Sequence, residues 1–542
     1  MRLRFSDFGW SRLPFIGEEF VLDALRGRRG RNALIRWIKA SYSPKESWHS
    51  FDATSWEHPW LTQDNLRRSR QFEDAFVARL AERLEGQDTQ ERTYGFVGNL
   101  ANNMMIRAQA LREQAYHIDV VLHPQDDFVM SDPGWELADV RLPDGVRSIS
   151  GLAEHGIMLP DPPNVVRTAS SSTDVDDIWL PAMRSASWQW PTAHPASSFA
   201  RQVDVLRFAS YFNYLPTLEA LQKYDALFAA QAPYLAYLSG RPYLSAQTGG
   251  DLFFEASRDD TFGKLQRLSY KMSKALLATN PWAYSAARRF GFNHVVYAPL
   301  LIDTDAYSPG DRTYREQWER DTGGSFFVLA TARLDRRWKR SEIGFEGFKR
   351  FAAKTPEARL LLVGWGQDVD ELLAEFKKDG LHDRVHVLPV SGKRTLVNYL
   401  RSCDCVLDQF RIGYYGATAL EAMACGVPVV MKLQTDQYDA MCKTGAPPVL
   451  NASCPEDVTA ALSKLCASPE HLVAVSARGV RWIKENHSAY AWGETYGVLL
   501  AAAAAGLEFD FSEAPLNERL GLREMLYHYR QLRNAPKFPN YV

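Results

Sequence analysis

The stretch CDCVLDQFRIGYYGATALEAMACGVPVV, residues 403–430, decides the fold that we expect for this chain. Residues 403–408 are typical of a short buried strand, and a loop with Gly413 and Gly416 follows them. A helix is expected to begin near Ala417, and a Gly-Val-Pro turn then leads into another apolar strand. A strand, a glycine-rich loop, a helix and a further strand form the repeating unit of a Rossmann-like α/β domain.

The loop before this expected helix is a candidate site for a nucleotide diphosphate. Free backbone N–H groups and the positive end of the helix dipole converge where a helix begins, and both favour phosphate. Glu421, about one turn into the helix, carries a carboxylate that can accept hydrogen bonds from both hydroxyls of a ribose. The candidate donor-binding residues are Glu421, Gly413, Tyr414, Tyr415, Gly416, Ala417, Thr418 and, after another expected strand, Gly364.

The run GATALEAMACGVPVV resembles the donor-site signature of the retaining, GT-B-fold glycosyltransferases of family four. Many members carry a glutamate, seven residues, a second glutamate and then Ala-Met-Ala-x-Gly-x-Pro-Val-Val. Glu421 matches the second glutamate, whereas Gly413 stands where the first is usual. The family's first glutamate contacts the donor sugar. Because Gly413 replaces it here, the resemblance does not specify which sugar the donor carries. It covers roughly residues 93–490 and is strongest after Phe326.

Length and composition favour a soluble protein of about three domains, because 542 residues are too many for one core. The chain has 63 Lys+Arg against 65 Asp+Glu, a balance that gives no global sign of a nucleic-acid partner. No apolar run approaches the ~18 residues of a membrane span, and the start of the chain lacks a signal-peptide core. The six cysteines follow residue 400 without a CxxC pair, which fits buried thiols in a reducing cytoplasm.

Residues 1–91 are expected to form an N-terminal extension, with an ordinary helix over residues 63–84. The segment from Arg26 to Lys39 (RGRRGRNALIRWIK) holds six basic residues and no acidic one. One interpretation is a peripheral contact with an anionic membrane, at its inner, cytoplasmic face. The other is a charged helix face that packs against the rest of the fold.

An alternation of strands and helices begins at Thr93 and predicts a first Rossmann-like domain, residues 92–310. Gly98 and Asn99 follow its first strand and are candidates for an acceptor or cleft loop, because ligands of open α/β sheets gather at the carboxyl ends of strands. The run GNLANN also resembles the loop at which the family's first domain faces donor and acceptor. Residues 124–200 interrupt the alternation as an insertion with little expected regular structure, either near the acceptor or packed on the surface.

Asp251 is a further candidate, on the loop TGGD after an expected strand over residues 242–247. Its carboxylate could hold an acceptor or sugar hydroxyl as part of the catalytic site, or it could cap the following helix. The histidine that many relatives of the resembling family carry near this loop is missing, with Gln247 and Thr248 in its neighbourhood.

A second Rossmann-like domain is expected over residues 311–488, followed by a crossover helix and tail, residues 489–542. Leu300 to Pro309 resembles the family's interdomain linker. The predicted fold is therefore α/β of the GT-B type, with two Rossmann-like domains facing each other across a cleft.

Arg333 and Lys339 are candidate catalytic cations on the loop after the first strand of the second domain. A diphosphate leaving group gains charge as the glycosidic bond breaks, so fixed cations stabilise the transition state more than the ground state. The resembling family also has an Arg, a short spacer and a Lys here. Asp-x-Asp occurs three times, but so short a pattern arises about once or twice by chance in a chain this long, so we predict no metal and no other cofactor.

The sequence thus predicts an enzyme that transfers a sugar from a nucleotide-diphosphate donor to a hydroxyl, with the retention that the resemblance implies. The acceptor is expected to be a glycan or a lipid-linked molecule in polysaccharide or glycoconjugate synthesis, by analogy alone. One alternative is a degenerate GT-B domain that binds nucleotide or glycan without catalysis. The other is a sugar-nucleotide epimerase or phosphorylase of the same fold.

Overall fold

A computed structural model gives the arrangement of most of the chain after residue 57. The basic segment from Arg26 to Lys39 lies outside the described residues, and so does most of the second half of the predicted insertion. The structure describes residues 58–87, 91–123, 127–168, 215–253, 255–257, 261–334, 336, 339–366, 368–519, 521–524 and 526–527.

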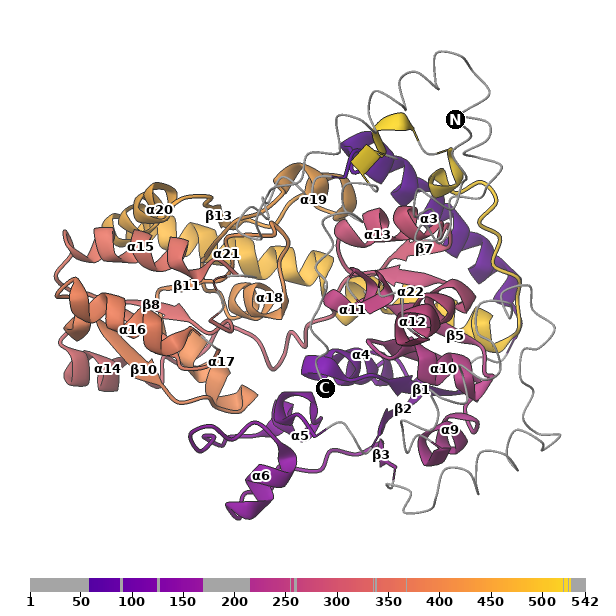
Figure 1. Ribbon diagram of the computed structural model, residues 1–542, viewed down its shortest axis with the longest axis horizontal. Coiled ribbons are helices and arrows are strands. Elements are labelled where there is room, and N and C mark those ends of the chain that lie inside the picture. The colour runs from indigo at the N-terminus through magenta and orange to yellow at the C-terminus, as the bar shows by residue number, and fades with distance from the viewer. Residues whose placement is uncertain are drawn as a thin grey trace, which may run out of the picture.

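The first domain contains a seven-stranded parallel sheet in the order β3-β2-β1-β4-β5-β6-β7 (Figure 1). Every residue of β4, in the middle of this order, is buried, as expected for a strand with helices on both faces of its sheet. The strands are β1 (Thr93–Val97), β2 (His117–Leu122), β3 (Val165–Arg167), β4 (Ala226–Ala230), β5 (Tyr243–Ala246), β6 (Leu276–Ala278) and β7 (Val295–Tyr297). The helices between them are α4 (Asn103–Arg112), α9 (Leu215–Leu221), α10 (Pro233–Ser239), α11 (Gly250–Phe253), α12 (Thr261–Met272) and α13 (Trp282–Phe290).

The second domain contains a six-stranded parallel sheet in the order β10-β9-β8-β11-β12-β13. Its strands are β8 (Phe326–Ala330), β9 (Ala358–Val363), β10 (Val385–Leu388), β11 (Cys405–Leu407), β12 (Val429–Met431) and β13 (Leu450–Asn451). Its helices are α14 (Arg315–Thr322), α15 (Ser341–Ala352), α16 (Val369–Lys378), α17 (Lys393–Ser402), α18 (Ala417–Ala424), α19 (Thr435–Met441), α20 (Pro455–Ala467) and α21 (Pro469–Asn486). The neighbouring strands β8 and β11 end at the same edge, which brings the loops after them together.

The last long helix returns to the first domain, as the sequence predicts. In α22 (Ala489–Ala504) the hydroxyl of Tyr496 donates to the carbonyl oxygens of Ala298 and Pro299, at 3.1 and 2.8 Å. The helix α3 (Gln63–Leu84), whose bounds match the expectation, packs against α22. Two Rossmann-like domains with this crossover form the GT-B fold (Figure 1).

The described part of the predicted insertion has more regular structure than we expected. It contains η6 (Val129–Ser131), α5 (Gly134–Leu137), α6 (Ile149–Glu154) and the edge strand β3. The expectation failed because these elements are short and are fixed by contacts distant in sequence. Arg167, at the end of β3, pairs with the carboxylate of Asp132 at 2.6 Å.

Residues 127–159, here called the bridging segment, connect the two domains. The amide of Leu142 donates to the carbonyl of Val390 at 2.8 Å, and the amide of Gly392 donates to the carbonyl of Val140 at 2.8 Å. These bonds form a short antiparallel bridge between the segment and the chain that enters α17. In Figure 1 the segment lies beneath the space between the two domains, with α5 below α4. The described part of the predicted insertion therefore contacts both domains.

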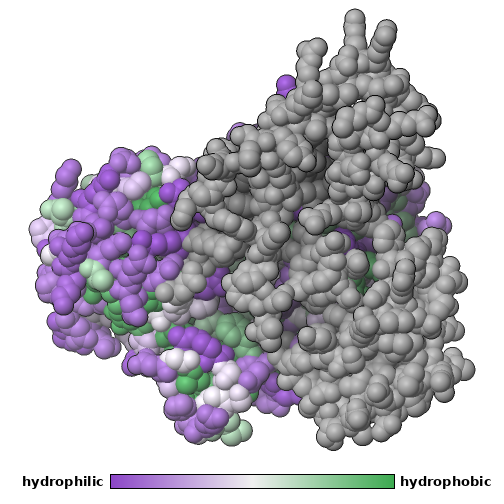
Figure 2. All heavy atoms as spheres, viewed as in Figure 1, coloured by the Kyte–Doolittle hydropathy of each residue, from purple (hydrophilic) through white to green (hydrophobic). Residues whose placement is uncertain are grey.

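The visible face of the second domain is predominantly hydrophilic, with small apolar areas between charged and polar side chains (Figure 2). Within the described ranges, no helix is both long enough and apolar enough to cross a membrane.

Candidate functional site

The amino end of α18 offers room for an anion. Gly416 is the residue before the helix, and no atom lies within 4 Å of the position that a Cβ would take there. Ala417 and Thr418, the first helical residues, are partly exposed. The free amides of this first turn therefore face space that a phosphate could occupy.

The tyrosines of the preceding loop turn inward. The hydroxyl of Tyr414 donates to Gln437 Oε1 at 2.9 Å, and that of Tyr415 lies 3.0 Å from Nε2 of His487. The ring of Tyr415 also stacks on Tyr438, with centroids 4.4 Å apart. Both side chains are buried, so their contacts hold the loop in place and their side chains do not face a ligand.

Gly413 occupies a conformation that a glutamate would adopt only under strain. Its φ is +80°, in the left-handed region, and a Cβ there would lie 2.9 Å from Cγ of Gln434. The amide of Gln434 donates to the carbonyl of Gly413 at 2.9 Å and keeps the two residues together. The backbone conformation at position 413 therefore disfavours the glutamate that the resembling family carries there.

The loop after β8, which carries Arg333 and Lys339 and is here called the cationic loop, contacts the start of the loop after β11. The amide of Phe410 donates to the carbonyl of Lys339 at 2.8 Å, and Nζ of Lys339 donates to Gln409 Oε1 at 3.3 Å. Arg333 is exposed on the same cationic loop. Arg336 lies apart from them, because its guanidinium pairs with Glu375 on α16 at 2.6 Å.

Asp408 lies between these loops and was not predicted as a site residue. Its carboxylate is buried, and neither oxygen has a hydrogen-bond partner. Burial raises the pKa of Asp408, the nearby charge of Lys339 opposes the rise, and Glu421 adds to it. A charged residue at the end of an otherwise apolar strand was the only sequence signal.

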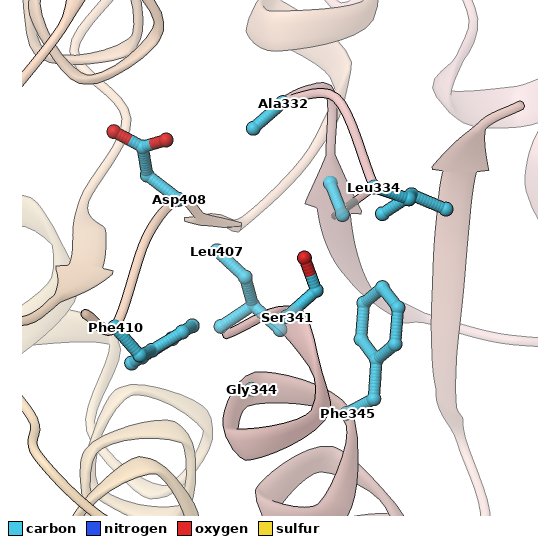
Figure 3. A pocket seen from close by; sticks show the side chains of 9 residues that line it. Ala332, Leu334, Ser341, Gly344, Phe345, Leu407, Asp408 and Phe410 are labelled. Carbon is cyan, nitrogen blue, oxygen red and sulfur yellow. The ribbon is translucent and has the colours of Figure 1, made fainter. Parts of the chain in front are cut away.

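A chamber of about 10 Å³ lies against this strand end, and that volume is enough for about one water molecule. In Figure 3 the carboxylate of Asp408 rises beside Ala332 and points away from Leu407. The lining is mostly apolar: Ala330, Ala332, Leu334, Ser341, Gly344, Phe345, Leu407, Asp408 and Phe410. The chamber is therefore too small for a nucleotide, and it is lined by Ala332 and Leu334 of the cationic loop as well as by Asp408.

Glu421 is buried on α18 and is paired with Nζ of Lys393, the first residue of α17. Burial lowers the pKa of Lys393, but the charges of Glu421 and then Glu136 outweigh it, so that the pKa is raised. The predicted ribose ligand thus has a cationic partner, which sequence reasoning missed.

Glu136 brings a second carboxylate to Lys393 from the bridging segment. Its Oε2 accepts a hydrogen bond from Tyr307 in the interdomain linker at 3.1 Å, whereas Oε1 is buried without a partner. Burial raises the pKa of Glu136 to about 7, and the charge of Glu421 adds to the rise, whereas Lys393 and the neighbouring side chains of Tyr307 and Asn102 oppose it. Three helices and the linker therefore converge on one charged cluster, here called the Lys393 cluster, which consists of Glu136, Lys393, Glu421 and Tyr307.

The candidate residues of the first domain are held by their own neighbourhood. Asp251 accepts hydrogen bonds from Thr248, Gly249 and the hydroxyl of Tyr270, the last at 2.7 Å. These donors occupy most of the sites that a carboxylate offers. The contacts favour a role in shaping the loop over one in holding a substrate hydroxyl.

Asn99 has a comparable role in the loop after β1. Its side chain donates to the carbonyl of Ser131 at 2.8 Å and accepts from the amides of Met104 and Met105 at 3.0 and 2.8 Å. The residue is buried, and these bonds connect α4 to the bridging segment, so its side chain is not free to contact an acceptor. At Gly98, where φ is +82°, a Cβ would meet the carbonyl oxygen of Ala230 at 1.7 Å.

Gly364 allows close packing at the end of β9, since a Cβ there would approach Val387 Cγ1 to 2.7 Å. Val387 lies in β10, at the edge of the sheet, whereas α18 follows β11 on the other side of β8. Gly364 is therefore separated from α18 in the order of the sheet. Among the described side chains, no group of three His, Cys, Asp or Glu residues is placed to hold a metal ion.

The second domain is similar to a known family. The model of the family "Glycosyl transferases group 1" matches residues 312–481. A D-inositol 3-phosphate glycosyltransferase from Segniliparus rotundus is 26% identical over 213 residues, which are 39% of this chain and 46% of that protein. A mannosylfructose-phosphate synthase from Agrobacterium fabrum is 32% identical over 157 residues, 27% of this chain and 34% of that protein. The chain thus matches less than half the length of these curated relatives.

Two solved structures resemble larger parts of the chain. Anabaena HepE in complex with UDP and glucose aligns over 74% of this chain and 96% of its own, with 15% identity and a TM-score of 0.49. Sucrose-phosphate synthase from Thermosynechococcus elongatus aligns over 82% of this chain and 100% of its own, with 16% identity and a TM-score of 0.47.

Proposed function

We propose that this protein is a glycosyltransferase that moves a sugar from a nucleotide-diphosphate donor to a hydroxyl acceptor. The observation that carries the proposal is the contact between the loops after β8 and β11, where Lys339 contacts Gln409 and Phe410 in the loop that leads to the open amino end of α18. The similarity of residues 312–481 to group 1 glycosyl transferases supports it.

Each group has a defined role in this proposal. Arg333 and Lys339 bind the diphosphate as a bidentate donor and a point charge, and the amides from Gly416 to Thr418 bind its remaining oxygens. Glu421 accepts hydrogen bonds from the ribose hydroxyls. The cations strengthen their hold as negative charge develops on the leaving diphosphate, which lowers the barrier for the transfer itself.

The proposed reaction retains the configuration of the sugar and needs no enzymic nucleophile. The bond from the anomeric carbon to the diphosphate oxygen breaks, and the acceptor oxygen forms the new bond on the same face. The acceptor proton passes to an oxygen of the leaving diphosphate. No metal or other cofactor is required in this scheme, because the cations and the helix amides carry the charge stabilisation.

The proposed setting is the cytoplasm, in polysaccharide or glycoconjugate synthesis with a glycan or lipid-linked acceptor. A peripheral membrane contact through residues 26–39 belongs to the same proposal, on the basis of their basic and apolar composition.

Binding of nucleotide without transfer is a second candidate, and two observations favour it. Gly413 cannot be replaced by the glutamate of the resembling family without backbone strain, and Glu421 is already paired with Lys393. A nucleotide-binding lobe that has lost its sugar contacts would show both features.

A thermal-shift screen against UDP-, GDP-, ADP-, CDP- and dTDP-sugars tests the proposal, because a ligand of the folded state at 100 times its Kd adds about 2.7 kcal/mol of stability. The bound donor is then incubated with and without a panel of glycan and lipid-linked acceptors. Release of nucleoside diphosphate that depends on an acceptor supports transfer. Binding without release across the panel supports the second candidate, and no binding to any donor overturns both.

A further inference from the structure

The cluster of Glu136, Lys393, Glu421 and Tyr307, of which Glu421 and Tyr307 are buried and the other two partly buried, contains one cation and two carboxylates. Lys393 is paired with Glu421, while Oε1 of Glu136 is buried and accepts no hydrogen bond. A buried acceptor without a donor costs about 1–3 kcal/mol, and more when it is charged. Lys393 therefore pairs with Glu421, whereas one oxygen of the Glu136 carboxylate has no hydrogen-bond donor.

A donor nucleotide would change this balance. If the proposed function holds, a ribose diol donates hydrogen bonds to the Glu421 carboxylate. It then competes with Lys393 for Oε1 of Glu421. Glu136 is the other carboxylate near Lys393, because it accepts a hydrogen bond from Tyr307, and Nζ of Lys393 lies 6.0 Å from the centroid of that tyrosine ring. The flexible four-carbon stem of a lysine allows a move between two neighbouring anions.

We infer that Glu136 is a positioning residue for the donor: when a ribose takes Glu421, Lys393 transfers to Glu136, so that donor binding is coupled to the ionisation of Glu136. This inference rests on the proposed function and adds to it. It assigns a role in the donor site to the bridging segment, although that segment belongs to the first domain.

The groups that face Glu136 determine the sign of the coupling. They are Lys393 from α17, Glu421 from α18, the hydroxyl of Tyr307 in the linker and the amide of Asn102 in the loop after β1. Burial keeps the pKa of Glu136 at about 7 in the free protein. The arrival of Lys393 favours the ionised form, so donor binding releases a proton near neutral pH and becomes tighter as pH rises.

The magnitude follows from that pKa of about 7 in the free protein. Below pH 7 the carboxyl must lose its proton before Lys393 can transfer, whereas at pH 8 it is already ionised. We expect the Kd to fall about tenfold between pH 6 and pH 8.

The experiment is isothermal titration of the full chain with the nucleotide sugar that gives the largest thermal shift, at pH 6, 7 and 8. Both phosphates of a nucleotide sugar are esterified, so the ligand lacks the secondary phosphate ionisation near pH 6. Titration in two buffers of different ionisation enthalpy gives the number of protons released. Wild type should release about half a proton at pH 7, as linkage at the pKa predicts.

Glu136→Gln keeps the shape of the side chain but cannot ionise, so its Kd should change less than twofold across the range. Glu136→Asp retains a carboxyl and should restore the pH dependence in part. Glu154→Gln is the matched control, because Glu154 is exposed on α6 of the same segment. It should behave as wild type.

The outcomes distinguish a failure of the role of Glu136 from a failure of the proposed function. A nucleotide sugar that binds wild type with the same Kd and no proton release from pH 6 to pH 8 overturns the role of Glu136 and leaves the proposed function intact. The same holds if Glu136→Gln keeps the wild-type pH dependence. A failure of every nucleotide sugar to bind overturns the proposed function and this inference together. The wild-type measurement decides the question even if Glu136→Gln does not fold.

Discussion

Replacing Glu421 by Ala should weaken nucleotide binding and destabilise the fold by separate mechanisms. The lost ribose contacts are hydrogen bonds to a charged group, and their loss should cost about 1.5–3 kcal/mol in total, so we expect the Kd to rise about 10- to 150-fold. The change also leaves Lys393 buried without its partner. Breaking a buried pair in this way costs about 3–5 kcal/mol of unfolding free energy.

A second substitution distinguishes these two effects. In the double variant Glu421→Ala, Lys393→Met no unpaired charge remains, and stability should return close to that of wild type. The nucleotide affinity should stay low, because the ribose ligand is still missing. Titration calorimetry measures the Kd, and urea denaturation at pH 7 measures the unfolding free energy. Our reasoning is refuted if the double variant regains wild-type affinity, or if Glu421→Ala binds within twofold of wild type.

Three further predictions concern groups around the same loops. Burial lowers the pKa of His487 to about 4, so the neutral imidazole stabilises the fold above pH 6.5, and this stabilisation should be lost as pH falls toward 4. Denaturation curves should show that the free energy of unfolding falls by about 3 kcal/mol over this range, and by less in His487→Gln. Burial raises the pKa of Asp408, so the stability that its neutral carboxyl contributes is present below the unfolded pKa of 3.8 and is lost as pH rises through the folded pKa. Asp408→Asn should therefore be more stable than wild type at pH 7 by about 1–3 kcal/mol. Below pH 3.8 the substitution should give no gain in stability. Gly413→Glu should lose about 1–2 kcal/mol through its left-handed backbone, and adding Gln434→Ala should recover only the steric part; a variant as stable as wild type would contradict the strain.

Most strands and helices of both sheets could be predicted because their signals are local. The apolar runs that end at Gly98 and Gly364, and the helix from Ala417, lie where periodicity and glycines predict them. The meeting of the Lys339 loop with the glycine loop also follows from sheet topology, since loops at the carboxyl ends of neighbouring parallel strands adjoin.

The side-chain partners could not be predicted in the same way, because they depend on tertiary packing. Glu136 lies in a segment without helical or strand periodicity, so nothing local predicts that it approaches Glu421. The saturation of Asp251 depends on Tyr270, which reaches it from the next long helix. The pairing of Lys393 with Glu421 likewise needs the relative placement of α17 and α18, which no local pattern specifies.

The hydrophobic core of the first domain takes residues from both ends of the described chain, and this has a consequence for synthesis. Trp492 and Tyr496 from α22 share that core with Leu66 and Phe76 from α3 and with the buried residues of the first sheet. A nascent chain emerges from the ribosome at about 5–20 residues per second, so the earlier domain waits for its closing helix while the later one is already complete. The first domain therefore exposes an unfilled apolar surface until translation has passed α22, and a chaperone would act during this interval.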